Sequence, residues 1–287
     1  MVRRLAFVLA IALIVLPFSL GVPIYDVSPS HVEAVSPVAA RTLTEPPEPP
    51  PPGMEEVWAA AEAIDHSPGL ATNGKLGTSG SKIALTFDDG PDPHVTPQIL
   101  DTLREHHLKA TFFVVGSQVE KNPGLLRRIV QEGHTIGNHT YDHADMSRLS
   151  PGQMRSELQS TQKAVDDALG YHYRLALMRP PYGEPYFDGS GALPAFRRVV
   201  RQQQTFPVVW TIDTQDYVMA GRPRGIVRNV VSQDDAGRRQ NRDEVILMHD
   251  IHPQDAQALP AIIDRYEGSG RKFVGVDELL RDKYLSQ

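Results

Sequence analysis

The sequence contains no cysteine among its 287 residues. This absence excludes disulfide bonds, thiolate metal sites, a cysteine nucleophile and a lipid-modified cysteine anchor. Any metal site in this chain must therefore be built from histidine and carboxylate side chains. Positive charge is also scarce, because 29 Lys and Arg residues stand against 35 Asp and Glu, which gives a formal net charge of -6. Without a clustered excess of Lys and Arg, nothing in the sequence indicates nucleic-acid binding.

A long apolar run lies near the amino terminus, directly after Arg3 and Arg4. It extends from Leu5 to Leu20, and a short basic stretch followed by such a run is the pattern of an export signal. The run is long for a cleaved signal and short for a membrane span of about 20 residues. We therefore expect residues 1–21 to be a signal peptide or a membrane anchor. The protein is then exported and extracytoplasmic, either secreted or anchored at the cell surface.

Proline and glycine are frequent in the next stretch, residues 22–80. Its segment Glu45–Gly53 (EPPEPPPPG) should be extended, semi-rigid and unable to pack a core. A short helix can form from Met54 to Ile64. We expect residues 22–80 to be a linker that holds the following domain, residues 81–287, away from a membrane surface.

From Lys82 onward, short apolar runs alternate with amphipathic stretches. Strands are expected at Ile83–Phe87, Thr111–Val115, Thr135–Gly137, Ala176–Arg179, Val208–Ile212, Val245–Met248 and Lys272–Val276. Helices are expected at Pro97–His106, Pro123–Gln131, Leu193–Gln203, Ile226–Gln233, Gln257–Tyr266, Asp277–Leu285 and after a capping box of Ser150 and Gln153. This alternation predicts an α/β fold, a distorted (β/α) barrel with about seven parallel strands, and a doubly wound sheet is the alternative.

Polar residues stand where the expected strands end, and in a parallel α/β fold these ends gather at one face. The first strand runs directly into Asp88 and Asp89, followed by Gly90 and Pro91. Adjacent carboxylates point in different directions, so one can bind a cation while the other acts on a proton. The same residues are also good turn formers, which is the simpler interpretation.

The third strand is followed by His139 and His143. Histidines four residues apart lie on one face of a helical turn, where both imidazoles can reach one ion. The spacing resembles HExxH, but Thr140 replaces the glutamate, so Asp88 or Asp89 would have to supply a base. Two histidines and a carboxylate would leave an open position for water, as metal-assisted hydrolysis requires. Solvated surface histidines are the alternative interpretation.

Three further strand ends carry residues suited to the same chemistry. The fourth expected strand ends in Arg179, and the planar guanidinium of an arginine can hold a carboxylate through several N–H donors. The alternative is that Arg179 and the prolines after it simply form a rigid loop. Those prolines can preset a backbone N–H toward an oxyanion. The sixth strand ends in His249, which is either a core histidine or a general acid. A nearby carboxylate such as Asp216, at the end of the fifth strand, would raise the pKa of His249 and keep it protonated.

In this order, the stretches TFDDGP, HTYDH, RPPYG, DTQDY and LMHD resemble the five motifs of the NodB-like polysaccharide deacetylases, carbohydrate esterase family four. The stretch from Asn122 to His143 is also similar to that family, and the resemblance covers about Lys82 to Leu280. The set of motifs is specific, although any single motif would not be. It implies a distorted (β/α) barrel and a divalent metal, usually zinc, with cobalt or other divalent ions as alternatives.

The resemblance also implies a role for each residue around the metal. Asp89, His139 and His143 would be the metal ligands. Asp88 would be the general base that takes a proton from water, and Arg179 would orient Asp88.

A second group of residues would act on the substrate. The backbone N–H of Tyr182 would stabilise the oxyanion together with the metal, and His249 would protonate the leaving amine. Asp216 would tune His249, while Leu247 and Tyr217 would shape the pocket for the acetyl methyl group.

Two residues depart from the family pattern. Ala144 stands where proline is frequent, and Tyr217 stands where tryptophan is common. We expect neither to touch a metal ligand or the acid–base pair, so they should alter the groove and the choice of substrate rather than abolish activity.

The sequence thus predicts a metal-dependent hydrolase that removes N-acetyl groups from an extracellular or cell-wall polysaccharide. Peptidoglycan is the first expected substrate, followed by a chitin-like N-acetylglucosamine polymer. An O-acetyl esterase acting on xylan or a similar polymer is the alternative within the same chemistry. A wall-binding module that no longer reacts is the alternative from another class. The expected partner is the acetylated polysaccharide, with no nucleic acid, and any membrane contact would come from the N-terminal segment.

Overall fold

The computed structural model describes residues 54–64, 80–187, 189 and 191–285. The expected signal peptide or anchor, residues 1–21, and most of the expected linker lie outside these residues. No helix in the described part of the chain is long and apolar enough to cross a membrane.

Eight parallel strands of the described chain form one sheet in the order β5-β4-β3-β2-β1-β7-β6, and β8 also pairs with β1. They are β1 (Lys82–Asp88), β2 (Thr111–Val114), β3 (Thr135–Asn138), β4 (Leu177–Met178), β5 (Phe206–Pro207), β6 (Ile212–Asp213), β7 (Glu244–His249) and β8 (Lys272–Phe273). β2 pairs with the end of β1, at Thr86–Asp88, whereas β8 pairs with its beginning, at Lys82–Ile83.

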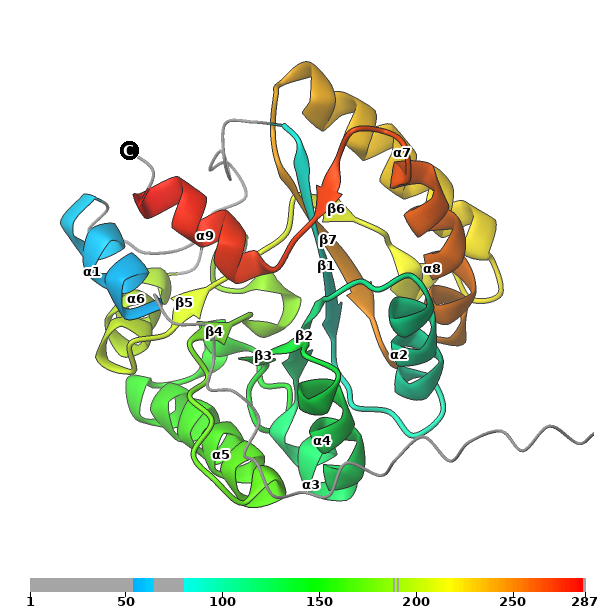
Figure 1. Ribbon diagram of the computed structural model, residues 1–287. Coiled ribbons are helices and arrows are strands. Elements are labelled where there is room, and N and C mark those ends of the chain that lie inside the picture. Colours follow the sequence, from blue (N-terminus) through cyan, green and yellow to red (C-terminus); the bar gives the residue numbers. More distant parts are fainter. Residues whose placement is uncertain (1–53, 65–79, 188, 190, 286–287) are drawn as a thin grey trace, which may run out of the picture. The chain divides into compact units, whose positions relative to one another are not determined.

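The sheet curls into an incomplete barrel, which confirms the expected distorted (β/α) barrel (Figure 1). Its two end strands, β5 and β6, are joined by residues 208–211 alone, a connection that spans at most about 17 Å. The single strand expected at Val208–Ile212 is wrong. Instead, the side chain of Arg179 donates to the carbonyl of Val208 (3.0 Å) and approaches that of Val209 (3.5 Å), so these carbonyls are not available to a neighbouring strand.

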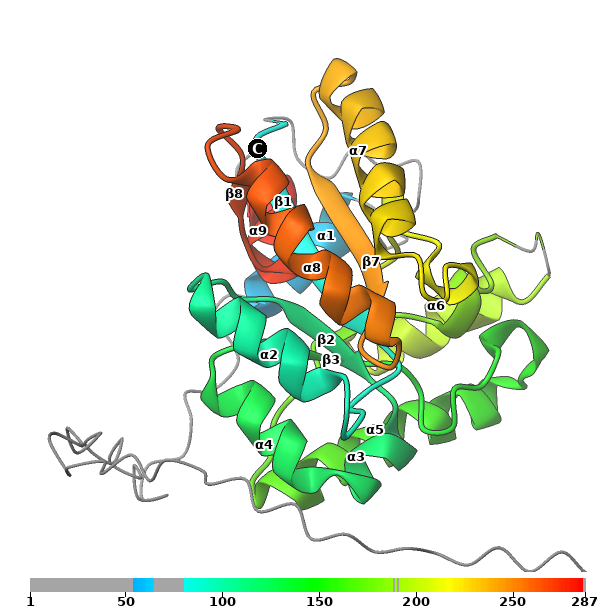
Figure 2. The same cartoon turned by 90° about the vertical axis from the view of Figure 1, so that its right-hand side faces the viewer.

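Helices surround the sheet (Figures 1 and 2). They are α1 (Met54–Ile64), α2 (Thr96–Glu105), α3 (Gly116–Lys121), α4 (Pro123–Gln131), α5 (Pro151–Leu169), α6 (Leu193–Gln202), α7 (Pro223–Arg239), α8 (Pro253–Tyr266) and α9 (Val276–Leu285). Short 3-10 segments are η1 (Met146–Arg148), η2 (Pro181–Gly183) and η3 (Asp216–Val218). The expected capping box is present, since the side chain of Ser150 accepts from the Gln153 N–H and the side chain of Gln153 accepts in return. The short α3 was not expected from the sequence.

Side chains of β1 alternate between two cores. Ile83, Leu85 and Phe87 join the cluster that packs under the outer helices. The intervening positions face the barrel interior, where Ala84 is followed by the polar Thr86 and Asp88. The interior is therefore apolar where β1 begins and polar where it ends, which places the charged groups at the carboxyl face of the sheet.

Helix α1 lies within the segment that we expected to be a linker. Its Trp58 ring packs edge-on against Phe206, with 4.7 Å between ring centroids. Val57 and Ala61 are fully buried in the same cluster as residues of α9 and the starts of the barrel strands. Residues 54–64 thus pack as part of the domain, against the end of the barrel opposite its polar face.

Candidate active site

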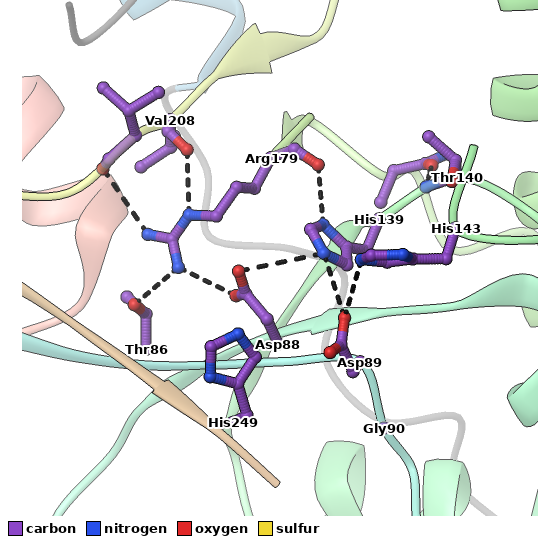
Figure 3. Close-up of polar contacts among 12 residues, drawn as sticks. Thr86, Asp88, Asp89, Gly90, His139, Thr140, His143, Arg179, Val208 and His249 are labelled. Carbon is purple, nitrogen blue, oxygen red and sulfur yellow. Dashed lines mark hydrogen bonds and ion pairs between the residues drawn. The ribbon is translucent and has the colours of Figure 1, made fainter. Parts of the chain in front are cut away.

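Three side chains converge just beyond β1 and β3 (Figure 3). Oδ1 of Asp89 lies 3.2 Å from Nε2 of His139 and 3.1 Å from Nε2 of His143. This oxygen is buried and makes no hydrogen bond of ordinary geometry within the described residues. Burial alone would raise the pKa of Asp89, but the two imidazoles beside it lower that pKa below its usual range, so the carboxylate is ionised. One carboxylate oxygen and two imidazole nitrogens directed at a common point fit a divalent metal such as Zn²⁺.

The two histidines converge through a loop, and the helical turn predicted from their spacing is wrong. Thr140 and His143 both have left-handed backbone conformations, with φ of 66° and 63°. Two side chains close the loop: Oδ1 of Asn138 accepts from the Thr140 N–H (2.9 Å), and Oγ1 of Thr140 accepts from the Ala144 N–H (3.0 Å). Left-handed non-glycine residues cost on the order of 1 kcal/mol each and collect at functional sites.

Arg179 connects the cluster of Asp89, His139 and His143 to Asp88. Its backbone carbonyl lies 2.7 Å from Nδ1 of His139, so Nδ1 carries the proton and Nε2 is left for a metal. Its guanidinium is fully buried and donates to Oδ1 of Asp88 (2.8 Å) and to Oγ1 of Thr86 (2.8 Å). The adjacent carboxylates at the end of β1 therefore have different main partners: Asp88 accepts from the arginine, with His139 3.8 Å away, whereas Asp89 contacts both histidines at 3.1–3.2 Å.

His249 and Asp216 form a second buried pair on the other side of Asp88. Nδ1 of His249 lies 2.8 Å from both carboxylate oxygens of Asp216, and Asp216 also accepts from the Tyr217 N–H (2.8 Å). Burial lowers the pKa of His249, but the hydrogen bond with Asp216 outweighs this effect and raises that pKa to about 9. Burial would raise the pKa of Asp216, yet the contact with His249 lowers it. At neutral pH the pair is thus an imidazolium and a carboxylate.

The remaining predicted residues, Leu247, Tyr182 and Tyr217, lie next to His143 or His249. Leu247 is buried two positions before His249 and therefore lies on the same face of β7. Tyr182 is exposed, and its ring packs edge-on against His143 at 4.8 Å. Tyr217 is also exposed, and its ring meets that of His249 edge-on at 6.0 Å. The expectation that Tyr217 touches neither acid nor base is therefore wrong.

Sequence reasoning gave no role to two buried carboxyl groups beside the site, Asp250 and Asp255. Asp250 accepts from the Gly90 N–H (2.9 Å) and from the Thr96 hydroxyl (2.6 Å), so it braces the turn that follows Asp89. A Cβ at Gly90 would lie 2.0 Å from Asp250, which explains the glycine. The position of Asp250 directly after a candidate acid was a usable signal. Asp255 lies in the first turn of α8 and its carboxyl group contacts that of Asp216. No motif or spacing in the sequence pointed to it.

Comparison with known proteins agrees with this geometry. The chain matches the sequence family described as Polysaccharide deacetylase over residues 75–190. A relative from Listeria monocytogenes, named peptidoglycan-N-acetylglucosamine deacetylase PgdA, is 40% identical over 206 residues, which cover 71% of this chain and 40% of that protein. A Bacillus cereus relative, named peptidoglycan-N-acetylglucosamine deacetylase, is 35% identical over 206 residues, which cover 70% of this chain and 89% of that protein.

This chain therefore matches less than half of the length of the Listeria relative but most of the Bacillus one. Among solved structures, the Bc1960 peptidoglycan N-acetylglucosamine deacetylase, in complex with 4-naphthalen-1-yl-N-oxidanyl-benzamide, is 30% identical with a TM-score of 0.62. The similarity covers 76% of this chain and 95% of that one. With the five motifs gathered at one face of the barrel, these similarities show that the chain belongs to the polysaccharide deacetylase family, carbohydrate esterase family four.

Proposed function

We propose that this protein is a metal-dependent deacetylase that removes N-acetyl groups from the N-acetylglucosamine of peptidoglycan. The observation that carries the proposal is the placement of Asp88 and His249 beside one another, at the paired ends of β1 and β7, next to the cluster of Asp89, His139 and His143. Asp88 is held by a buried arginine, and His249 is held protonated by a buried carboxylate. A base and an acid next to one cation-binding point are the groups that hydrolysis of an acetamide requires.

In this proposal each residue has one task. A divalent ion, most simply zinc, held by Asp89, His139 and His143 would polarise the acetyl carbonyl and lower the pKa of a water molecule. Asp88 takes the proton from that water. Arg179 keeps the Asp88 carboxylate directed toward the water molecule.

The acid side of the reaction follows from the second buried pair. His249 donates its Nε2 proton to the departing amine, and Asp216 keeps Nδ1 protonated. The backbone N–H of Tyr182 donates to the oxyanion. Leu247 and Tyr217 line the space for the acetyl methyl group.

Peptidoglycan is proposed as the substrate because several relatives carry that substrate in their names. The same names support an extracytoplasmic site of action. We further propose that residues 1–21 serve as the export signal or membrane anchor and that the proline-rich part of residues 22–53 serves as the linker.

The test is a mass-spectrometric screen for acetyl loss from peptidoglycan, chitooligosaccharides and acetylated xylan, with zinc added or with a chelator. We expect acetyl loss from peptidoglycan that requires the metal. Release from xylan alone would identify an O-acetyl esterase, whereas stoichiometric metal with no acetyl loss would identify an inactive wall-binding module. Asp88→Asn is the matched control: because an amide cannot take the proton, kcat should fall by roughly 10²- to 10⁴-fold while the metal stays bound.

A further inference from the structure

A third carboxyl group lies behind the pair of His249 and Asp216. Asp255 is fully buried, and neither of its carboxyl oxygens receives a hydrogen bond of ordinary geometry from the described residues. Its carboxyl group instead contacts the carboxylate of Asp216. The preceding residue, Gln254, donates to the backbone carbonyl of Asp216 (3.0 Å), so the first turn of α8 is held against η3.

Two carboxylates in contact at a buried position cannot both be ionised, so one of them must hold a proton. Asp216 is the ionised member, because both of its oxygens accept from His249 and one also accepts from the Tyr217 N–H. Asp255 has no comparable donors. The groups that face it are the Asp216 carboxylate from η3, the Asp250 carboxyl from β7 and the backbone of His249. Burial, followed by the negative charge of Asp216, raises the pKa of Asp255 to about 11.

We propose that Asp255 is a positioning residue whose protonated carboxyl donates a hydrogen bond to Asp216 and holds that carboxylate in the orientation that binds His249. The inference rests on the proposed function, in which His249 protonates the leaving amine. Without this donor, the Asp216 carboxylate can rotate away from Nδ1 of His249, and the imidazolium loses its fixed direction toward the substrate. Asp255 lies behind the pair and does not line the substrate space, so its loss should lower kcat and leave KM nearly unchanged.

Two substitutions of Asp255 distinguish the loss of its hydrogen-bond donor from a change in side-chain packing. Asp255→Leu keeps the branched shape of the side chain without a donor, and kcat should fall by about 10- to 100-fold, the range typical of residues that hold a site residue in place. Asp255→Asn keeps an N–H donor and should retain kcat close to that of the wild type. Asp264, exposed on the same helix, provides the matched control Asp264→Leu, which should leave both constants unchanged.

A double-mutant cycle tests whether Asp255 acts through Asp216. In an Asp216→Asn background, Asp255→Leu should cause no further loss of kcat, because the carboxylate that it positions is gone. A folded Asp255→Leu variant with wild-type kcat would overturn the proposal. An Asp255→Asn variant as impaired as Asp255→Leu would overturn it as well, because the hydrogen-bond donor would then be irrelevant.

Infrared spectroscopy tests the proton itself, without turnover. At about pH 9 the neighbouring buried acid Asp250 is ionised because its pKa is about 7, whereas Asp255 keeps its proton. The difference spectrum between the wild type and Asp255→Asn should therefore contain a carboxylic-acid C=O band. Its absence would overturn the proposal even if the leucine variant did not fold. A wild type that releases no acetate yet shows the band would refute the proposed function and leave the protonation of Asp255 supported.

Discussion

Replacing Asp216 with asparagine removes the carboxylate that keeps His249 protonated, and the consequence depends on pH. The pKa of His249 is about 9, compared with 6.5 for an ordinary histidine. Once the Asp216 carboxylate is gone, burial lowers the pKa of this imidazole and the charges of Asp88 and Asp89 raise it, so the ordinary value of 6.5 is the reference for the variant. The asparagine side chain has nearly the same shape, so the change is confined to the negative charge and to one acceptor oxygen, which becomes an NH2 group.

These two pKa values give the size of the effect. At pH 8 the protonated fraction of His249 falls from about 0.9 to about 0.03, which is a loss of roughly 30-fold in the active form. At pH 6 it falls only from about 1.0 to about 0.8. The deficit of Asp216→Asn in kcat/KM should therefore be small at pH 6 and large at pH 8. A bound dication shifts the titrations of both proteins in the same direction, so the difference between them remains diagnostic.

The assay is acetate release from an N-acetylated glycan, with kcat/KM measured from pH 5.5 to about pH 10 for both proteins. We expect the alkaline limb of the profile to move to lower pH in the variant by about 2.5 pH units, the difference between the two pKa values. Parallel profiles, offset by one constant factor at every pH, would refute the reasoning, because Asp216 would then not set the protonation of His249.

The same shift affects the stability of the metal-free protein. The folded state binds the His249 proton more tightly than the unfolded state, by 9 − 6.5 = 2.5 pKa units, or about 3 kcal/mol. This contribution is fully present below about pH 6.5 and is lost as the pH rises through about 9. Urea unfolding of the wild type should therefore show this loss between pH 6 and pH 10, and Asp216→Asn should lack it.

Three other substitutions test separate parts of the structure. His143→Ala removes one of the three proposed ligands, so the metal content measured by elemental analysis should fall well below one ion per chain; full occupancy would show that His143 is not a ligand. Arg179→Met leaves Asp88 buried without its cation and should lower the free energy of unfolding by about 3–5 kcal/mol in urea titrations; a loss under about 1 kcal/mol would show that the pair is unimportant for stability. Trp58→Ala should cost about 3–5 kcal/mol, because the ring is buried against Phe206; an unchanged unfolding midpoint would show that α1 does not pack on the domain.

Local sequence patterns predicted the elements that depend on local information. The apolar run of β1 and the capping box at Ser150 were both read correctly, because alternation and capping are set within a few residues. The strand expected at Val208–Ile212 was not, because there the backbone carbonyls accept from Arg179, a residue that follows β4 and lies 29 positions earlier in the sequence. Helix α1 was placed in a linker for a related reason, since its burial depends on α9 at the other end of the chain.

The candidate site shows the same division. The order of the motifs predicted that Asp89, His139 and His143 share one site, and the structure places them around one point. The four-residue spacing of the histidines predicted a helical turn that is absent, because the conformation of Thr140 is fixed by the side chain of Asn138 and not by helical periodicity. Asp255 escaped notice since a single acid in the first turn of a helix is ordinary, and only its contact with Asp216 makes it unusual.

The central claim is that Asp89, His139 and His143 hold one divalent cation. Its most direct test is a crystal structure of the protein grown with Zn²⁺, with anomalous data collected at the zinc absorption edge. We predict one anomalous peak at about 2.0–2.2 Å from Oδ1 of Asp89 and from Nε2 of both histidines. Crystals that contain one zinc ion per chain but show no anomalous peak between these three side chains would contradict the claim, as would an ion bound elsewhere.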